Sequence, residues 1–229
     1  MTDANTPDVI VRPYEPRDRD AVRRIACDTA NAGKPIETFF NDRELAADLL
    51  TTYYTDFEPE AAWVADQNGR VAGYLTGCRD TGRFMRCMAW RVAPRALNRA
   101  IARGTMGDPA FWRLVRRNMG IWLRGLFQRR VPLKAYPGHL HLNLDPAFRG
   151  QQIGRRLAER CLKQFVAWHV RGIHANVREN NARALRFFER LGFIRIDRHP
   201  FLRTEDSLLY SIVLGKKLTP DVRAKLTAS

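Results

Sequence analysis

The pattern of apolar and polar positions divides the chain into strands and helices. Short apolar runs bounded by turn residues predict three strands in the first third, at 9–12, 61–66 and 71–78. Asn68-Gly69 is a typical two-residue hairpin turn between the last two. Apolar residues at helical spacing predict a helix over 18–32 and a second helix that begins after Asn41-Asp42. This third therefore has the order strand, helix, helix, strand, strand.

The second half of the chain repeats the alternation of strands and helices. Residues 140–144 alternate apolar with polar positions, which predicts a strand. Further strands are expected at 173–177, 193–197 and 208–214. Helices are expected over 152–170 and from Asn180-Asn181 to Arg190, where Leu191-Gly192 supplies a glycine stop. The whole pattern predicts an α/β fold, with a mixed central sheet of about six to seven strands and helices on both faces.

Composition narrows the class of protein. The 229 residues suit one large domain, and a hydrophobic content of 45% is enough for a core. The first dozen residues are polar and acidic, unlike a signal peptide, and no apolar run is long enough to span a membrane. The four cysteines have neither metal-ligand nor disulfide-framework spacing. We therefore expect a cytoplasmic protein without a membrane partner.

The net charge of +15 is concentrated in one segment. Residues 83–135 contain twelve arginines and one lysine against one acid, which gives +12 for this segment and about +3 for the rest. Helical periodicity over 96–103 and 111–129 predicts a basic helical insertion between strands. Because tryptophans are interspersed among these arginines, the segment could form a surface that binds nucleic acid or an acidic partner. We favour a lid that packs its aromatic residues on the sheet and exposes its arginines; a third interpretation is a wall of a substrate site that attracts anions.

One stretch, DPAFRGQQIGRRLAERCL (145–162), combines a turn, two glycines and the start of an amphipathic helix. The first N–H groups of a helix lack partners within the helix, and the helix dipole favours an anion beside them. Gly150 and Gly154 permit close approach to the backbone, while Arg149, Arg155 and Arg156 add positive charge. By itself the stretch is equally compatible with a tight strand-to-helix turn carrying exposed arginines.

The same loop and a later motif resemble the Gcn5-related N-acetyltransferase (GNAT) superfamily. The family's cofactor loop, Q/R-x-x-G-x-G/A, corresponds to residues 149–154, Arg-Gly-Gln-Gln-Ile-Gly. The family's N-x-x-A-x-x-F-Y motif corresponds to residues 181–188, Asn-Ala-Arg-Ala-Leu-Arg-Phe-Phe, and Leu-Gly-Phe follows at 191–193. The resemblance implies that 1–229 is a single GNAT domain and that 83–135 is an insertion within it.

This resemblance assigns a binding mode for acetyl-CoA as co-substrate. The molecule would lie between the strands 140–144 and 173–177, which splay apart in the family, and the pantetheine would contact the backbone of Leu142, Asn143 and Leu144. Asn181 would lie near the pantetheine arm. Arg149 would add positive charge to the loop, and N–H groups of the loop would bind the pyrophosphate: Gly150, Gln151, Gln152, Ile153, Gly154 and Arg155.

The reaction implied by the family is direct attack of an amine on the thioester, with backbone N–H groups stabilising the oxyanion. Two residues depart from the family pattern, since Gln152 replaces a glycine and Phe188 replaces the tyrosine that often protonates the leaving thiolate. A thiol has a pKa near ~8.5, so at about pH 7.5 the missing proton donor costs roughly 1.4 kcal/mol. We therefore expect the loss of this acid to slow the reaction rather than prevent it.

The base is less clearly marked. His139, His141 and Asn143 share one face of the strand 140–144, and related proteins often have an acid where Asn143 stands. His141 is the candidate base, with a hydrogen-bonded structural histidine as the alternative. A metal site of His139, His141 and His174 is less favoured, and we expect no metal. Tyr53 and Tyr54 are equally compatible with the acceptor site and with the core.

A narrower resemblance concerns residues 27–34, 53–80 and 137–146. They are similar to the acetyltransferase-like domain of O-linked N-acetylglucosaminidases and its stand-alone bacterial relatives. That domain in animals is regarded as a pseudo-acetyltransferase.

From the cofactor loop and the second motif together, the sequence predicts an N-acetyltransferase acting on a small-molecule or peptide amine. Two alternatives stay open: a pseudo-acetyltransferase binding module, and a nucleic-acid- or ribosome-directed acetyltransferase that uses the basic insertion.

Overall fold

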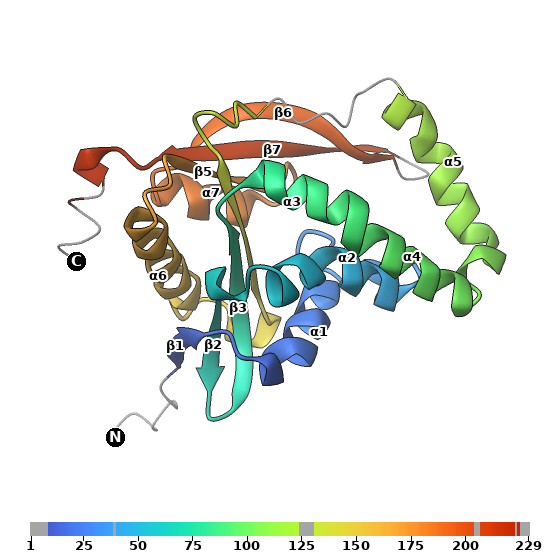
Figure 1. Ribbon diagram of the computed structural model, residues 1–229, viewed down its shortest axis with the longest axis horizontal. Coiled ribbons are helices and arrows are strands. Elements are labelled where there is room, and N and C mark those ends of the chain that lie inside the picture. Colours follow the sequence, from blue (N-terminus) through green and yellow to red (C-terminus); the bar gives the residue numbers. More distant parts are fainter. Residues whose placement is uncertain (1–8, 39, 124–130, 204–206, 223, 225–229) are drawn as a thin grey trace.

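A single open sheet of seven strands organises the protein. The computed structural model describes residues 9–38, 40–123, 131–203, 207–222 and 224. The strands follow the order β1-β2-β3-β4-β5-β7-β6, and among these neighbours only β4 and β5 are parallel (Figure 1). Their bounds are β1 (Ile10–Pro13), β2 (Ala62–Gln67), β3 (Arg70–Cys78), β4 (Gly138–Leu144), β5 (Gly172–Arg178), β6 (Ile194–Arg203) and β7 (Leu208–Lys217). The predicted mixed α/β sheet is confirmed, and β6 is longer than the predicted 193–197.

Helices cover both faces of this sheet, also as predicted. They are α1 (Arg19–Thr29), α2 (Arg43–Asp56), α3 (Thr81–Cys87), α4 (Ala93–Ala102), α5 (Pro109–Leu123), α6 (Ile153–Ala167) and α7 (Ala182–Arg190). Residues 124–129 of the predicted helix 111–129 lie outside the described part of the chain. Within the described residues, no helix has both the length and the apolar character required to cross a membrane.

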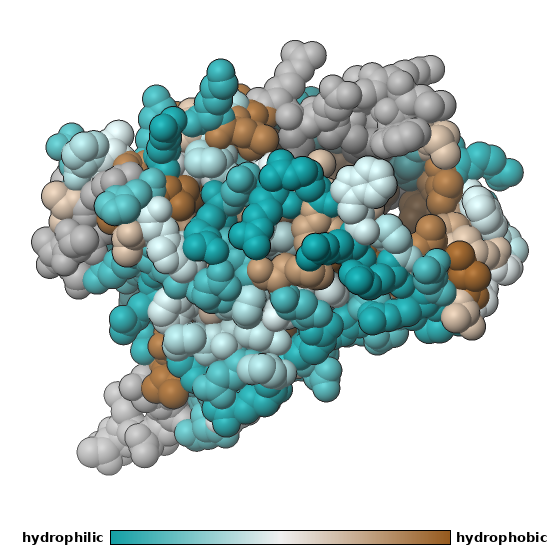
Figure 2. Space-filling model, viewed as in Figure 1, coloured by the Kyte–Doolittle hydropathy of each residue, from teal (hydrophilic) through white to brown (hydrophobic). Residues whose placement is uncertain are grey.

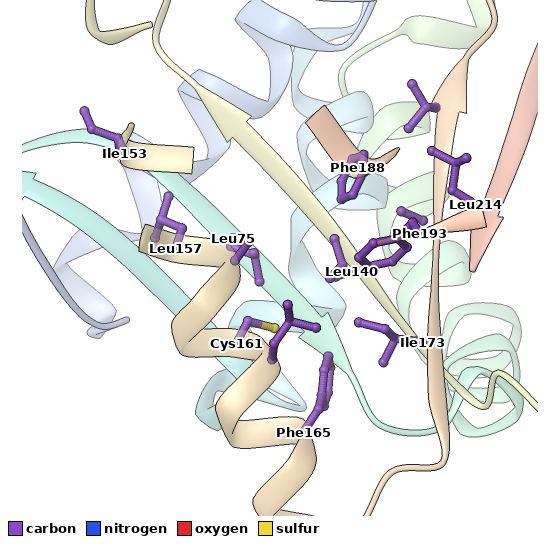
Figure 3. Packing of buried hydrophobic residues seen from close by; sticks show 14 of the residues in the cluster. Leu75, Leu140, Ile153, Leu157, Cys161, Phe165, Ile173, Phe188, Phe193 and Leu214 are labelled. Carbon is purple, nitrogen blue, oxygen red and sulfur yellow. The ribbon is translucent and has the colours of Figure 1, made fainter. Parts of the chain in front are cut away.

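The main core lies between the sheet and the pair α6 and α7. One face of α6 places Ile153, Leu157, Cys161 and Phe165 against apolar side chains of β3, β4 and β5 (Figure 3). Each such side chain contributes about 1.5–3 kcal/mol by leaving water. This packing fixes α6 against β4, so the loop that joins them is held at the end of β4.

The opposite face of the sheet packs against α1, and an ion-pair cluster closes its edge. Arg12 of β1 donates to both carboxylate oxygens of Asp18, at 2.7 and 2.8 Å, and to Asp66 of β2 at 2.7 Å. Burial alone would raise the pKa of Asp18, but the bonds from Arg12 and from the N–H of Glu15 lower it below its usual range. The charged carboxylate is therefore part of the folded structure.

The connection between β3 and β4, residues 79–137, is more helical than its periodicity predicts. The expected helix starts at 96, whereas α3 begins at Thr81, capped by the Asp80 side chain, and continues through a π-helical turn (Met88–Val92) into α4. The pattern misses this start because apolar residues lie on both sides of the helix. Phe84 packs inward on Tyr54, while Trp90 is 81% exposed.

The favoured interpretation of this segment, a lid that packs its aromatic residues on the sheet, is wrong for two of its three tryptophans. Trp90 and Trp112 are exposed, and Trp122 lies among residues whose side chains are not described. The packing of this segment on α2 instead uses small side chains of α4, with Ala96 and Ala100 against Leu45, and neither tryptophan is on that helix. Figure 2 shows hydrophilic side chains over much of this face, with hydrophobic ones among them.

Candidate active site

The two parallel strands at the centre of the sheet separate after two residues. Gly138 pairs with Ile173 and His139 with His174, and beyond them β4 pairs only with β3 while β5 pairs only with β7. We call the space between residues 140–144 of β4 and 175–178 of β5 the notch. Of the three residues expected to contact pantetheine, Leu142 and Leu144 turn their backbone groups toward the notch, whereas those of Asn143 point toward β3.

The loop at the N-terminus of α6 has a strained backbone. Gln152, its N-cap, has φ +56°, and Gly150 has φ +92°. The left-handed conformation is free of steric cost only for glycine, which is the residue that the family motif has at position 152. The N–H of Arg155 already donates to the carbonyl of Gln152 at 3.0 Å. Residues 151–154 therefore carry the N–H groups best placed for an anion.

The surroundings of this loop combine a narrow gap with positive charge. A Cβ at Gly154 would lie 3.5 Å from the ring of Phe187 and 3.6 Å from Leu142, so a small side chain fits and a large one would not. The guanidinium of Arg149 lies beside Gly33, and its Nη2 donates to the carbonyl oxygen of Leu144 at 3.5 Å. Burial and the neighbouring Arg183 lower the pKa of Arg149, as expected where cations gather without enough anions.

The second motif forms the start and inner face of α7. The side-chain oxygen of Asn181 accepts from the N–H of Ala184 at 3.1 Å, so this asparagine caps the helix. Phe188 is buried, with its ring edge-to-face against both Phe187 and Phe193. The assigned tyrosine position is thus a core residue in this protein, whereas Phe187 is the aromatic ring nearer to Gly154.

His139 is held in one tautomer by a buried chain of hydrogen bonds. Thr81 donates its hydroxyl hydrogen to the carbonyl of Pro137 at 2.7 Å, so toward Nδ1 of His139, 2.8 Å away, it can only accept. Nδ1 therefore carries the hydrogen, and in the neutral ring Nε2 accepts from the hydroxyl of Tyr54 at 2.8 Å. His139 is thus a hydrogen-bonded structural histidine, and Tyr54 is its partner. Tyr53 is a core residue whose hydroxyl donates to Glu58.

His141 and Asn143 continue the same face of β4 toward the notch. The His141 ring lies 5.5 Å from the Tyr54 ring and 5.6 Å from the His139 ring, centroid to centroid. The Asn143 amide donates to the Tyr74 hydroxyl at 2.8 Å and accepts from Thr29 at 3.1 Å. Asn143 thereby ties β4 to β3 and α1, a role that local sequence does not signal because its partners are 69 and 114 positions away.

The histidines do not form a metal centre in this arrangement. Both ring nitrogens of His139 hold hydrogen bonds, and Nδ1 of His174 faces the carbonyl of Tyr136 at 3.1 Å. Over the described ranges, no three His, Cys, Asp or Glu side chains are grouped so that they could share a metal ion. The geometry gives the metal interpretation no support.

Comparison with known proteins finds similarity both to this loop and to this fold. Residues 127–193, which include β4, the notch edge, the α6 loop and α7, match the acetyltransferase (GNAT) family. A crystal structure of a protein named SsHAT is 28% identical, covers 93% of this chain and 100% of its own, and superposes with a TM-score of 0.70. Residues 127–193 therefore match the GNAT acetyltransferase family, and the fold of the chain is that of a solved structure 28% identical to it.

More distant structures have the same fold. YncA from Salmonella typhimurium, solved with its cofactor acetyl-CoA, is 14% identical with a TM-score of 0.55, covering 93% of this chain and 95% of its own. The ribosomal-protein-alanine N-acetyltransferase from Brucella melitensis is 16% identical with the same TM-score, covering 93% and 99%. The narrower resemblance to the domain of O-linked N-acetylglucosaminidases stays a prediction.

Proposed function

We propose that this protein transfers the acetyl group of acetyl-CoA to the amine of a small molecule or a peptide. The observation that carries the proposal is the notch, which opens directly beside the N-terminal loop of α6. A single elongated ligand can therefore place its phosphates at the loop and its thioester between β4 and β5. The family match gives the type of ligand, because GNAT acetyltransferases use acetyl-CoA.

The residues around the notch fit the parts of this ligand. N–H groups of residues 151–154, with Arg149 and Arg183 nearby, suit the pyrophosphate. On the edge of β4 that faces away from β3, the backbone groups of Leu142 and Leu144 suit the two amides of pantetheine, which would bind as an added strand. Gly154 leaves the space that the ligand needs next to Phe187.

In the reaction, acetyl-CoA supplies an activated acyl group, and the protein positions the amine and manages its proton. An amine with a pKa near ~10.4 must lose a proton at a cost of about 4 kcal/mol at pH 7.5, so a base is useful. His141 is the proposed base, since it lies on the notch face of β4 beside Tyr54. Backbone N–H groups of β4 would stabilise the oxyanion. Phe188 cannot protonate the leaving thiolate, which then takes its proton from water.

Calorimetry with acetyl-CoA tests this proposal. We expect micromolar binding to the wild type and at least tenfold weaker binding to Gly154→Trp, whose indole would fill the gap beside Phe187. Gly107→Trp is the matched control, because nothing lies within 4 Å of a Cβ at that position. No heat at millimolar acetyl-CoA would remove the enzyme proposal. Binding without release of free thiol, over a panel of amines, would favour the pseudo-acetyltransferase instead, consistent with the buried Phe188 and the engaged Asn143 amide.

One observation favours a second candidate, a nucleic-acid-directed acetyltransferase. Exposed arginines line α3, α4 and α5 together with the exposed Trp90 and Trp112: Arg83, Arg86, Arg91, Arg95, Arg99, Arg103, Arg113 and Arg116. Such a surface suits phosphates and unstacked bases. RNA affinity measured against salt concentration should fall steeply and lose slope in Arg83→Gln/Arg86→Gln. The same double change at Arg160 and Arg186, which are also exposed, is the control. A flat salt dependence removes this candidate.

A further inference from the structure

The polar face of the notch has two arms, one on each strand. His139 and His174 are direct neighbours across the parallel pair, with ring centroids 5.5 Å apart, so they lie on the same face of the sheet. Side chains alternate along a strand, and this face therefore continues through His141 on β4 and through Asn176 and Arg178 on β5. The two faces of the sheet at the notch therefore differ in polarity, because the leucines of β4 lie on the other face, which packs against α6.

Asn176 offers an acceptor that the described part of the protein leaves unused. Its Oδ1 is buried and has no hydrogen-bond partner among the described residues. Its cross-strand neighbour on β7, Val213, is fully buried and apolar. A buried amide oxygen without a donor is costly, and the usual explanation is a ligand or water that supplies one. An N–H donor of a bound amine would satisfy it.

Arg178 supplies a cation at the open end of the same arm. Its guanidinium stacks on the ring of Phe201 at 3.8 Å, which orients the plane of the group. Burial lowers the pKa of Arg178 to about 10, so the side chain is still charged at neutral pH while it is partly removed from water. A planar guanidinium in such a setting binds a carboxylate in a two-point manner better than a lysine would.

We propose that Asn176 and Arg178 form an acceptor subsite for an amine that also carries a carboxylate. Residues two apart on a strand are separated by roughly 6.6 Å, which suits an amine near Asn176 and a carboxylate at Arg178 within one small molecule or one acidic residue. The amine then lies between the arms, where His141 faces it from β4. This inference rests on the proposed acetyl transfer, whose acceptor it specifies.

Matched pairs of amines test the subsite. Each pair differs only by the carboxylate: β-alanine with ethylamine, and phenylalanine with 2-phenylethylamine. Release of free CoA thiol gives kcat/KM for the intact protein. We expect the carboxylate-bearing member to be at least tenfold better in one pair or both, with the difference lost in Arg178→Met and partly kept in Arg178→Lys. Arg171→Met, an exposed arginine just before the same strand, should leave the ratio unchanged.

Calorimetry with acetyl-CoA on the same variants separates the two proposals. Normal acetyl-CoA binding together with equal rates within every pair overturns the subsite and leaves acetyl transfer intact. Loss of acetyl-CoA binding in Arg178→Met also overturns it, because the arginine would then serve the cofactor. Phosphoethanolamine replaces a carboxylate with a phosphate, and exclusive use of it would contradict the stated class. Failure of the wild type to bind acetyl-CoA would be a failure of the proposed function itself.

Discussion

The hydroxyl of Tyr54 in α2 lies 2.8 Å from Nε2 of His139 in β4, and the two groups are buried together. Because Thr81 accepts from the other ring nitrogen, Nδ1 carries a hydrogen, and in the neutral imidazole the phenol is the donor to Nε2. The pair connects α2 with His139, the last residue of β4 that pairs with β5 before the notch begins. It therefore fixes the ring against which His141 packs.

Removing the Tyr54 hydroxyl should destabilise the protein measurably. Tyr54→Phe removes the hydroxyl that donates to the buried Nε2 of His139, and we expect a loss of about 1–3 kcal/mol in the free energy of unfolding. Urea unfolding measures this loss. Thr81→Val and Thr81→Ser form the matched comparison, because only serine keeps the hydroxyl that orients Nδ1. Equal stability of Tyr54→Phe and wild type would show that the tautomer assignment is wrong.

The backbone at Gln152 gives a second prediction. A β-branched residue tolerates φ +56° poorly, so Gln152→Val should cost about 1–3 kcal/mol of unfolding free energy. Gln151→Val is the control, since Gln151 is exposed like Gln152 but is not among the residues with positive φ. Gln152→Gly should be at least as stable as wild type, within about 1 kcal/mol. A larger loss at Gln151 than at Gln152 would contradict this account of the loop.

Restoring the family tyrosine at position 188 tests how much the missing proton donor slows the reaction. Phe188→Tyr should raise kcat by no more than about tenfold, because the missing proton donor is worth roughly 1.4 kcal/mol. The added hydroxyl enters a buried cluster with Phe187 and Phe193, so stability should fall by about 1–3 kcal/mol unless it reaches the notch. Steady-state thiol release and thermal unfolding measure the two effects. Phe187→Tyr is the control, and a rise in kcat there but not at Phe188 would move the acid to the neighbouring ring.

The ion-pair cluster at the sheet edge predicts an acid-sensitive contribution to stability. The folded-state pKa of Asp18 lies below its unfolded value near ~3.9, so its stabilisation is complete above about pH 5 and is lost as the pH falls through the depressed pKa. Asp18→Asn should lose about 3 kcal/mol of unfolding free energy at pH 7, because Arg12 loses one of the two carboxylates to which it donates hydrogen bonds. Its unfolding free energy should then fall less on acidification than that of wild type.

Asp20→Asn is the control for this pH dependence, since Asp20 is exposed and lies two residues after Asp18, in the first turn of α1. Urea unfolding at pH 7 and at pH values below 4 compares the three proteins. Parallel acid curves for Asp18→Asn and wild type would show that Asp18 does not carry the linkage.

The local sequence was sufficient to predict an element where the spacing of apolar residues repeats along that element. The alternation in HLHLNL predicts β4, and apolar spacing from Ile153 to Phe165 predicts α6. The loop at 149–154 and its link to acetyl-CoA came from motif resemblance. The start of α3 was missed although Asp80 is a good cap, because Phe84 and Trp90 face opposite environments and weaken the period.

The side-chain arrangement of the site could not be read from the chain. Tyr54 and His139 are 85 positions apart, and only the folded sheet brings them together. The pairing of Asn176 with Arg178 on one face follows from strand alternation, but their position at an opening depends on β4 leaving β5 after His139. Tertiary contacts of this kind have no local periodicity to reveal them.

The hydrogen bonds between Thr81 and Pro137 have a consequence for the β3–β4 connection. The N–H of Thr81 donates to the carbonyl of Pro137 at 2.8 Å, and its hydroxyl donates to the same oxygen, so the connection leaves and re-enters the sheet at one point. Since β3 and β4 are adjacent antiparallel strands, a tight hairpin could join them with the register unchanged. Beyond Phe84, the length of this connection can therefore change without any change in the pairing of β3 with β4.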